Sequence, residues 1–347
     1  MSATKLLPSE LLATCCKLRF GNTSVIGCSQ FTRFNVSVLP LQFLHRLLFE
    51  ETKMQNLDQG VVRRTVGAKF ANTFVVLPAT QTRGGILIAV NEDYFQLSDQ
   101  HLSTHAVTAT VTMRADGTKW QITVVYGPQG DAEKLQFLQE LVAIPCLAHG
   151  RWLILGDFNL IYQAEDKNNS NLNRRLMASF KVVIDDLNLK EIGLNGRHFT
   201  WSNERDNPTL TRIDGLFCTP DWELTFPTCF LHSLPSLISD HTPLLLQGEL
   251  EHYHNRTFRF EIFWVKMDGF TNLVEQVWSK PVHSSLPIKR LHTKLARVAK
   301  GLKRWRREKV RDTRLQLAIV KEVLLQLEAA QEFRTLTQQE LDTCQAL

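Results

Sequence analysis

A short apolar run that stops abruptly at polar residues constrains this chain more than any other stretch. In residues 151–159, Arg-Trp-Leu-Ile-Leu-Gly-Asp-Phe-Asn, an apolar run gives way to glycine, and Asp157 and Asn159 follow. An apolar run of this length bounded by turn residues is typical of a strand covered on both faces of its sheet. Sheets with helices on both faces carry their chemistry at the carboxyl ends of such strands. Taken alone, the two polar residues are more often a simple side-chain turn at a strand end.

Other fragments share this pattern, because each places a polar side chain at the end of an apolar stretch. Carboxylates together with an amide, a phenol and an imidazole, and no serine or cysteine nucleophile, suit a hard divalent cation acting on a phosphate ester. Taken alone, the glutamate of such a fragment is more often part of the solvated surface, and the histidine is more often a surface or capping residue. The further residues are Glu51, Tyr126, Asp214, Asp240 and His241.

The middle of the chain alternates between strand-like and helix-like patterns. Apolar runs at 74–77 and 86–90 predict strands, and Asp-Gly at 116–117 between two alternating runs predicts a hairpin. Asp131 is the expected cap of a helix that follows the hairpin. A second helix packed on a sheet is predicted by the spacing of Leu176, Phe180, Val183 and Leu187.

Composition indicates a soluble globular protein of a reducing compartment. Apolar residues make up 44% and charged residues 22% of the 347 residues, and no apolar run reaches the length of a membrane span. The seven cysteines are odd in number and contain no Cys-x-x-Cys pair, which argues against a disulfide framework or a zinc site. The first residues make a poor secretory signal. We therefore expect a nuclear or cytoplasmic location.

The net charge of +5 is concentrated near the end of the chain. Between Lys289 and Arg314, twelve Lys or Arg residues stand against Glu308 and Asp312, a local charge of +10, so the rest of the chain carries about −5. Apolar residues at helical spacing run through the same segment, from Leu291 to Trp305. Such a helix fits a contact with DNA or RNA, and also a solvated coiled coil, which is the commoner meaning of the pattern.

Five of these fragments, in this order, resemble the motif set of the endonuclease/exonuclease/phosphatase superfamily. The match is close in the branch found in plant LINE-type (non-LTR) retrotransposon polyproteins. It covers roughly residues 49–250, and residues 166–169 and 199–203 fit it too. The fragments are Glu-Thr-Lys at 51–53, Tyr-Gly-Pro at 126–128, Gly-Asp-Phe-Asn at 156–159, Arg-Ile-Asp at 212–214 and Ser-Asp-His at 239–241.

The resemblance implies a metal site and groups that contact the phosphate. Glu51 would be a ligand of Mg²⁺, with Mn²⁺ as the alternative ion, and Asp240 would be a second acidic group near the metal. Tyr126 would offer its phenol to the phosphate. No other cofactor is implied.

The resemblance also implies the residues that move protons. Asp157 would orient or deprotonate the attacking water, and Asn159 would hold that water or the scissile phosphate. His241 would donate to a phosphoryl oxygen. Asp214 would fix the tautomer of His241 and raise its basicity.

The implied fold is an α/β, four-layer sandwich of two packed mixed β-sheets flanked by helices, with a C-terminal helical appendix. We expect a divergent N-terminal segment at 1–48, the nuclease-like domain at 49–250 and a basic helical spacer at 251–347. The spacer resembles the one that follows the nuclease in those polyproteins, and the chain would stop before a reverse transcriptase. The pattern carries no signal for an oligomeric state.

The N-terminal segment departs from the family pattern. The family opens with a strand that ends in asparagine, then a helix, then the strand that reaches the metal-binding glutamate. Here Asn35 lies only sixteen residues before Glu51, which leaves no room for a helix and a strand. We predict that residues 22–39 substitute for the lost strand in part, with Val36 and Val38 inward and Asn35 short of the metal.

The leading functional hypothesis is Mg²⁺-dependent phosphodiester hydrolysis on DNA, weakened by loss of the first catalytic strand. A phosphomonoesterase or lipid phosphodiesterase of the same fold is the alternative enzyme. The alternative from another class is a catalytically inactive remnant that binds nucleic acid or a partner through residues 289–314.

Overall fold

The computed structural model describes most of the chain from residue 37 onward. Its described residues form two compact units: the smaller holds residues 260–323, and the larger holds the rest of the described chain, including 324–346. Only the backbone is described for residues 37–39, 47–52, 262–263, 309–314 and 345. The described residues are 37–39, 47–52, 54–80, 83–145, 150–205, 207–236, 239–248, 260 and 262–346.

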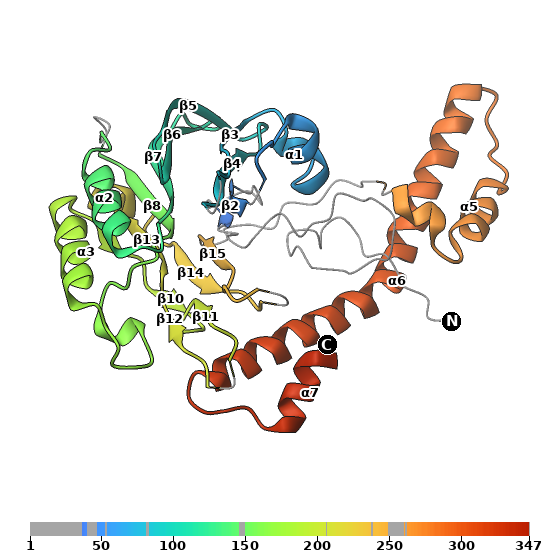
Figure 1. Ribbon diagram of the computed structural model, residues 1–347. Helices are drawn as coiled ribbons and strands as arrows, with labels where there is room; N and C mark the ends of the chain where they lie inside the picture. Colours follow the sequence, from blue (N-terminus) through green and yellow to red (C-terminus); the bar gives the residue numbers. More distant parts are fainter. Residues whose placement is uncertain are drawn as a thin grey trace. The chain divides into compact units, whose positions relative to one another are not determined.

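Two mixed β-sheets form the larger unit (Figure 1). Within the described chain, the sheet that carries the Trp152 strand has six strands, in the order β5-β6-β7-β8-β13-β9. Strands β7 and β8 are parallel, while the other neighbours in this sheet are antiparallel. The strands are β5 (Phe95–Leu102), β6 (Ala106–Met113), β7 (Lys119–Tyr126), β8 (Trp152–Asp157), β13 (Asp214–Cys218) and β9 (Lys190–Glu191).

The second sheet has seven strands among the described residues, in the order β10-β14-β15-β1-β2-β4-β3. A separate two-stranded ribbon pairs β11 (Trp201–Ser202) with β12 (Leu210–Thr211). The seven strands are β10 (Leu194–Asn195), β14 (Phe230–Ser233), β15 (Leu244–Gln247), β1 (Ser37–Leu39), β2 (Leu47–Thr52), β4 (Gly85–Val90) and β3 (Phe74–Leu77).

The short strand β1 occupies the place between β15 and β2. It runs parallel to β15 and antiparallel to β2. A strand–helix–strand unit produces parallel neighbours, so β1 and β2 do not form the opening unit of the family pattern. Asn35 and Val36 lie outside the described residues, as does the side chain of Val38, so their expected directions stay predictions.

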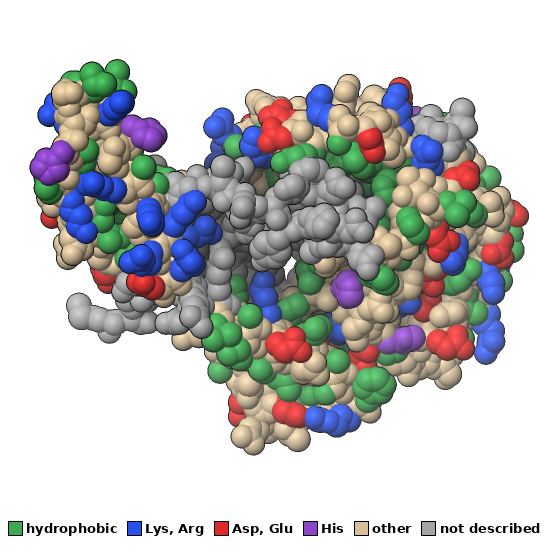
Figure 2. Space-filling view, turned by 180° about the vertical axis from the view of Figure 1, so that it is seen from behind, with side chains coloured by type: hydrophobic (Ala, Val, Ile, Leu, Met, Phe, Trp, Pro, Cys, Tyr) green, Lys and Arg blue, Asp and Glu red, His purple; other side chains and the backbone are tan. Residues whose placement is uncertain are grey.

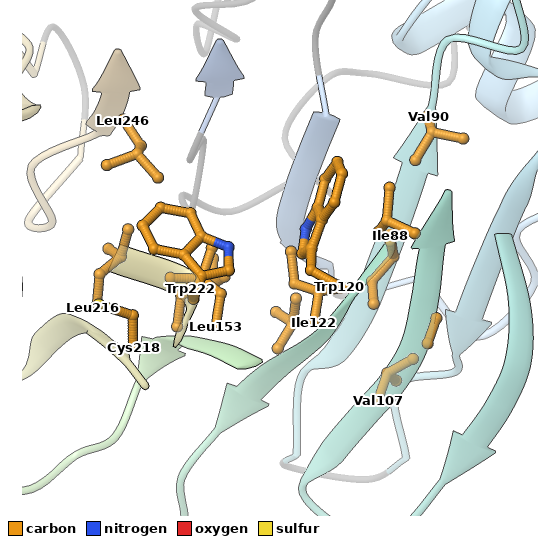
Figure 3. Packing of buried hydrophobic residues seen from close by; sticks show 14 of the residues in the cluster. Ile88, Val90, Val107, Trp120, Ile122, Leu153, Leu216, Cys218, Trp222 and Leu246 are labelled. Atoms are coloured by element: carbon orange, nitrogen blue, oxygen red, sulfur yellow. The ribbon is translucent and has the colours of Figure 1, made fainter. Parts of the chain in front are cut away.

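The main core lies between the two sheets (Figure 3). Strands of both sheets send alternate side chains into it, so Leu153 and Leu155 of β8 face inward while Trp152 and Ile154 face the other side. Trp120 and Phe226 meet edge to face at 5.3 Å within this layer. Every residue of β8 is buried, as its apolar run predicts.

Helices cover the outer faces of both sheets. Helices α2 (Asp131–Val142) and α3 (Arg174–Asp186) pack on the β7–β8 side, and α1 (Gln59–Thr65) packs on β4. The four-layer arrangement and the 107–126 hairpin are thereby confirmed.

One detail of the sequence interpretation is wrong: Asp131 is the first residue of α2, and Gly130 occupies the cap position. A carboxylate in the first turn still complements the helix dipole. The remaining short helices of this unit are η2 (Ala68–Phe70), η3 (Ala164–Asp166) and α4 (Pro220–Thr225).

The smaller unit consists of η4 (Ile262–Lys266), α5 (Phe270–Trp278) and the first part of α6 (Pro287–Gln331). Its core contains Trp264, Leu302 and Trp305, with the two indole rings 6.2 Å apart. Trp305 is therefore buried against the same unit and is not presented for stacking on a base. Leu291 and Leu295 are about half exposed. None of the described helices combines the length and the apolarity needed to cross a bilayer.

The end of α6 and helix α7 (Gln338–Ala346) belong to the larger unit. Arg197 is buried there between two glutamates of this C-terminal segment, 3.0 Å from Glu328 and 3.3 Å from Glu332. The predicted domain boundary at residue 250 stays a prediction. In the structure, residues 324–346 pack as part of the larger unit. Burial raises the pKa of Glu328 to about 7, although Arg197 opposes the shift.

The raised pKa of Glu328 predicts a pH dependence of stability. The folded protein holds this proton more tightly than the unfolded chain does, where the carboxyl keeps its ordinary value of 4.5. Stability from this group is therefore lost as pH rises from about 4.5 to about 7, by about 3 kcal/mol at most. We expect Glu328→Gln to flatten the wild-type slope of unfolding free energy between about pH 5 and 7.5, measured by urea denaturation.

Glu340→Gln is the matched control. The pKa of Glu340 is lowered to about 2 by its hydrogen bonds with Arg334 and Thr337, so this carboxyl does not titrate in the same window. If the unfolding free energies of Glu328→Gln and wild type changed equally with pH over this range, Glu328 would be ionised in the folded protein throughout it, and the prediction would be wrong.

Candidate functional site

The site begins at the last residue of β8. Asp157 pairs in register with Tyr126 of β7 on one side and with Asp214 of β13 on the other. Because β7 and β8 end at this edge and the antiparallel β13 begins there, three polar residues lie in one row across three strands. Asp157 is 3% exposed and Asp214 is 1% exposed, so both carboxylates are almost fully removed from water.

The backbone after β8 turns sharply and brings Asn159 back to Asp157. The backbone N–H of Asn159 donates to Oδ1 of Asp157 at 2.8 Å, and its side-chain amide lies 3.2 Å from Oδ2. The same amide nitrogen donates to the carbonyl of Gly127 at 2.7 Å. Asn159 adopts a left-handed conformation with φ of 50°, which asparagine tolerates better than most residues. The side-chain turn expected at the end of this strand is thus present, and it also fixes the direction of the buried Asp157 carboxylate.

Asp214 and His241 form a close pair. Nδ1 of His241 lies 3.0 Å from Oδ2 and 3.1 Å from Oδ1 of Asp214. This geometry suits an Nδ1–H that donates to the carboxylate and leaves Nε2 directed elsewhere. Asp157, Asp214 and His241 each offer a ligand atom, and these atoms all lie within 4.8 Å of one another. The structure therefore brings together three residues that are 57 and 27 positions apart in sequence.

The structure describes Asp240 with its side chain and Glu51 by its backbone alone. Asp240 accepts a hydrogen bond from the indole N–H of Trp201 at 3.3 Å, and its carbonyl accepts one from Ser202. Glu51 lies near the C-terminal end of β2, opposite Ile86 of β4, and only its backbone is described. Since β1 is parallel to β15 and antiparallel to β2, the end of β2 lies at the edge where β15 begins, just after His241.

Sequence reasoning missed Thr200, which is fully buried beside the cluster. Its hydroxyl accepts hydrogen bonds from the backbone N–H groups of Ile213 and Asp214, at 3.2 and 3.1 Å. Its carbonyl accepts one from Thr242 at 2.7 Å. A threonine in a polar loop carries no local signal for such a role, because its partners come from two distant segments.

Two charged residues next to the site were also missed. Burial lowers the pKa of Lys134, while the neighbouring carboxylates of Asp131 and Asp157 oppose that shift. Burial also raises the pKa of Asp166, whose carboxylate accepts hydrogen bonds from the backbone of Tyr162 and Gln163. Asp166 also supports the site backbone, since its carbonyl accepts the N–H of Arg212 at 2.7 Å.

Comparison with known protein families shows which family the chain belongs to. A family model described as "Endonuclease/Exonuclease/phosphatase family" matches residues 40–241, which is more than half of the chain. The chain belongs to the endonuclease/exonuclease/phosphatase family. The matched region ends at His241, so it includes every predicted site residue. Comparison with curated proteins gave no match.

Several solved structures are similar at low identity. The endonuclease domain of TRAS1, a telomere-specific non-LTR retrotransposon, is 18% identical, with 49% of this chain and 75% of that chain covered and a TM-score of 0.37. TDP2 of D. rerio complexed with single strand DNA product is 13% identical over 56% and 82%, with a TM-score of 0.36. An endonuclease/exonuclease/phosphatase of Bacteroides vulgatus is 13% identical over 55% and 80%, with a TM-score of 0.36.

The donor set at this edge fits the divalent metal that the family generally uses. Buried carboxylates without a balancing cation are costly, and oxygen ligands are the ones that Mg²⁺ and Mn²⁺ prefer. His241 fits an oxygen-ligated ion less well, because its Nδ1 is already directed at Asp214. Glu51 and Asp240 would therefore be the oxygen donors that hold the metal, with the Asp214–His241 pair beside it. These roles stay predictions.

The strand geometry at Gly156 generates a stability prediction. Gly156 has a φ of 139°, and a Cβ there would overlap the carbonyl oxygen of Val125 on β7. We expect Gly156→Ala to destabilise the larger unit by ~2 kcal/mol or more, because it adds backbone strain to a clash inside a sheet. Chemical denaturation would measure the loss. Gly193→Ala is the control, since a Cβ at Gly193 meets no atom within 4 Å and should leave stability nearly unchanged.

Proposed function

We propose that this chain is a divalent-metal-dependent phosphodiesterase that cuts DNA, in the manner of a retrotransposon-type endonuclease. The observation that carries the proposal is the convergence of Asp157, Asp214 and His241 within 4.8 Å at one edge of the sandwich. Family membership supports a hydrolytic reaction at this place. The electropositive stretch of α6 supports a polyanionic substrate.

In this proposal Asp157 takes the proton from the attacking water. Its two hydrogen bonds from Asn159 aim the carboxylate at one point. An ionised, oriented carboxylate is what a general base requires. Since the amide of Asn159 is fixed by Gly127, the direction of the base is set before the substrate binds.

His241 stabilises the charge that develops on the phosphoryl oxygens. Asp214 holds the ring through Nδ1, so Nε2–H is the group that can donate to the phosphate. The phenol of Tyr126, in register with Asp157, would add a further hydrogen bond. A divalent ion held by Glu51 and Asp240 would neutralise negative charge on the phosphate.

Two rival functions make different demands on the chain. A phosphomonoesterase or lipid phosphodiesterase of the same fold uses the same carboxylates but has no need for a basic helix. A catalytically inactive remnant would keep only the basic helix as its useful part. Both in the leading proposal and in the inactive remnant, the basic helix supports a nucleic-acid ligand, with RNA as the alternative to DNA.

The wider setting belongs to the same proposal. We place the chain among sequences related to plant LINE-type retrotransposons and in a reducing compartment, nuclear or cytoplasmic. Among the described residues, Cys218, Cys229 and Cys344 are free thiols. Burial raises the pKa of Cys218 to about 12 and that of Cys229 to about 11, so neither is activated for redox chemistry.

The proposal predicts slow, metal-dependent nicking of supercoiled DNA. Mg²⁺ or Mn²⁺ should be required, and chelation should abolish the nicks. Asp157→Asn and His241→Ala should each lower kcat by about 100-fold or more, because they remove the base and the donor to the phosphoryl oxygen. Conversion of supercoiled to open-circular plasmid would be measured by gel electrophoresis.

His101→Ala is the control for nicking, since His101 lies exposed on β5. Equal nicking by His241→Ala and wild-type protein would reject the assigned site. Hydrolysis of p-nitrophenyl phosphate without any nicking would favour the phosphomonoesterase.

The basic helix generates a separate prediction about binding. Lys300 and Arg304 are exposed one helical turn apart, and neutralised phosphates release counterions. Lys300→Gln/Arg304→Gln should weaken DNA binding at low salt and reduce the slope of log K against log salt by up to ~2. Fluorescence anisotropy over a salt series would measure the slope. Lys119→Gln/Lys190→Gln, at strand ends opposite the site, is the charge-matched control, and an equal effect of both pairs would refute a role of the helix.

A further inference from the structure

The C-terminal segment supplies Glu332, a carboxylate that contacts the loop beneath the site. Glu332 accepts hydrogen bonds from the backbone N–H groups of His198, at 2.9 Å, and Phe199, at 3.2 Å. It also accepts one from Nε of Arg197 at 3.3 Å. The side chain of Glu332 is only 3% exposed, so a residue about 90 positions beyond His241 is built into the larger unit.

The residues that follow the loop held by Glu332 contact the backbone at or next to both members of the Asp214–His241 pair. The next residue, Thr200, accepts the backbone N–H of Asp214 through its hydroxyl and that of Thr242 through its carbonyl. Trp201 then forms an antiparallel bridge with His241. One short segment therefore sets the backbone on both sides of the pair.

Arg197 connects the same loop to the segment that carries His241. Its Nη1 donates to the hydroxyl of Thr242 at 2.8 Å and to Glu328 at 3.0 Å. Glu328 in turn accepts the backbone N–H of Ser236 at 3.0 Å. Arg197 and Thr242 are both buried, so these hydrogen bonds are shielded from water.

We propose that Glu332 and Glu328 are positioning residues of the active site, which hold the Asp214–His241 pair in place through Arg197 and Thr200. This inference rests on the proposed function for its catalytic consequence. Removing an acceptor oxygen of Glu332 leaves at least one of the donors of Arg197, His198 and Phe199 without its partner, so the loop should shift rather than keep its place. A shift of about 1 Å at a catalytic group lowers the rate by about 100-fold.

The experiment compares Glu332→Gln with wild type in the full chain. Glutamine keeps the size of the side chain but loses one acceptor oxygen and the charge. We expect kcat for nicking to fall about tenfold or more while KM changes less than about twofold, because substrate contacts away from the Asp214–His241 pair stay intact. Amide hydrogen exchange of Ile213, Asp214 and Thr242 should become faster in the same variant, without added metal or DNA.

Glu340→Gln is the matched control, since Glu340 lies in the same C-terminal segment and pairs with Arg334 at the surface. It should leave both exchange and kcat unchanged. If Glu332→Gln fails to fold, Arg197→Lys decides, because lysine keeps the charge but has one nitrogen in place of the two that bind Glu332 through Nε and Thr242 and Glu328 through Nη1.

The two readouts separate the failure of this inference from the failure of the proposed function. Absence of nicking by wild-type protein would overturn the function, while faster exchange in Glu332→Gln would still support the positioning role. Unchanged exchange at residues 213, 214 and 242, or equal effects of the Glu332 and Glu340 variants, would overturn the inference.

Discussion

Strand β8 is the constraint on which the rest of the larger unit depends. It is buried on both faces, with one set of side chains in the core between the sheets and the other under α2 and α3. Its register with β7 and β13 leaves no freedom for the residues at its end, because slipping by one position would turn Leu153 and Leu155 out of the core. The placement of Asp157 opposite Asp214 is therefore a consequence of core packing. The two carboxylates at this edge therefore occupy positions that hydrophobic burial has already fixed.

Local pattern predicted much of this unit because the pattern and the packing agree. The buried run before Asp157, the hairpin around residues 116–117 and the stripe of α3 each have one stable solution next to a sheet. The family resemblance implied that Asp214 would hold His241, and these two side chains do lie within hydrogen-bond distance, while the catalytic roles of the site residues stay predictions. Pattern could not supply the partners of single polar residues. Thr200 and Glu332 act through contacts between segments far apart in sequence, and their local sequence does not reveal which residues they contact.

The two ends of the chain show different limits of sequence reasoning. At the N-terminal end, β1 fills a gap between β15 and β2 but runs antiparallel to β2, a direction that spacing alone could not reveal. At the C-terminal end, a periodic apolar seam suggested either a coiled coil or a nucleic-acid contact. Part of that seam, including Leu302 and Trp305, instead packs inside the smaller unit. Periodicity identified the helix correctly, while the identity of its partner depended on tertiary contacts.

The charges at the site give a physical argument for a cation that does not depend on family membership. Asp157 and Asp214 are nearly fully buried within 4.8 Å of His241, and Asp240 precedes that histidine directly. Lys134 offsets part of this negative charge from a position where burial lowers its pKa. A phosphate group brought to this edge would add further negative charge next to carboxylates in a medium of low dielectric. A phosphate ester at this edge would therefore need a counter-charge beyond Lys134, and a divalent ion at the oxygen donors of this edge would supply it.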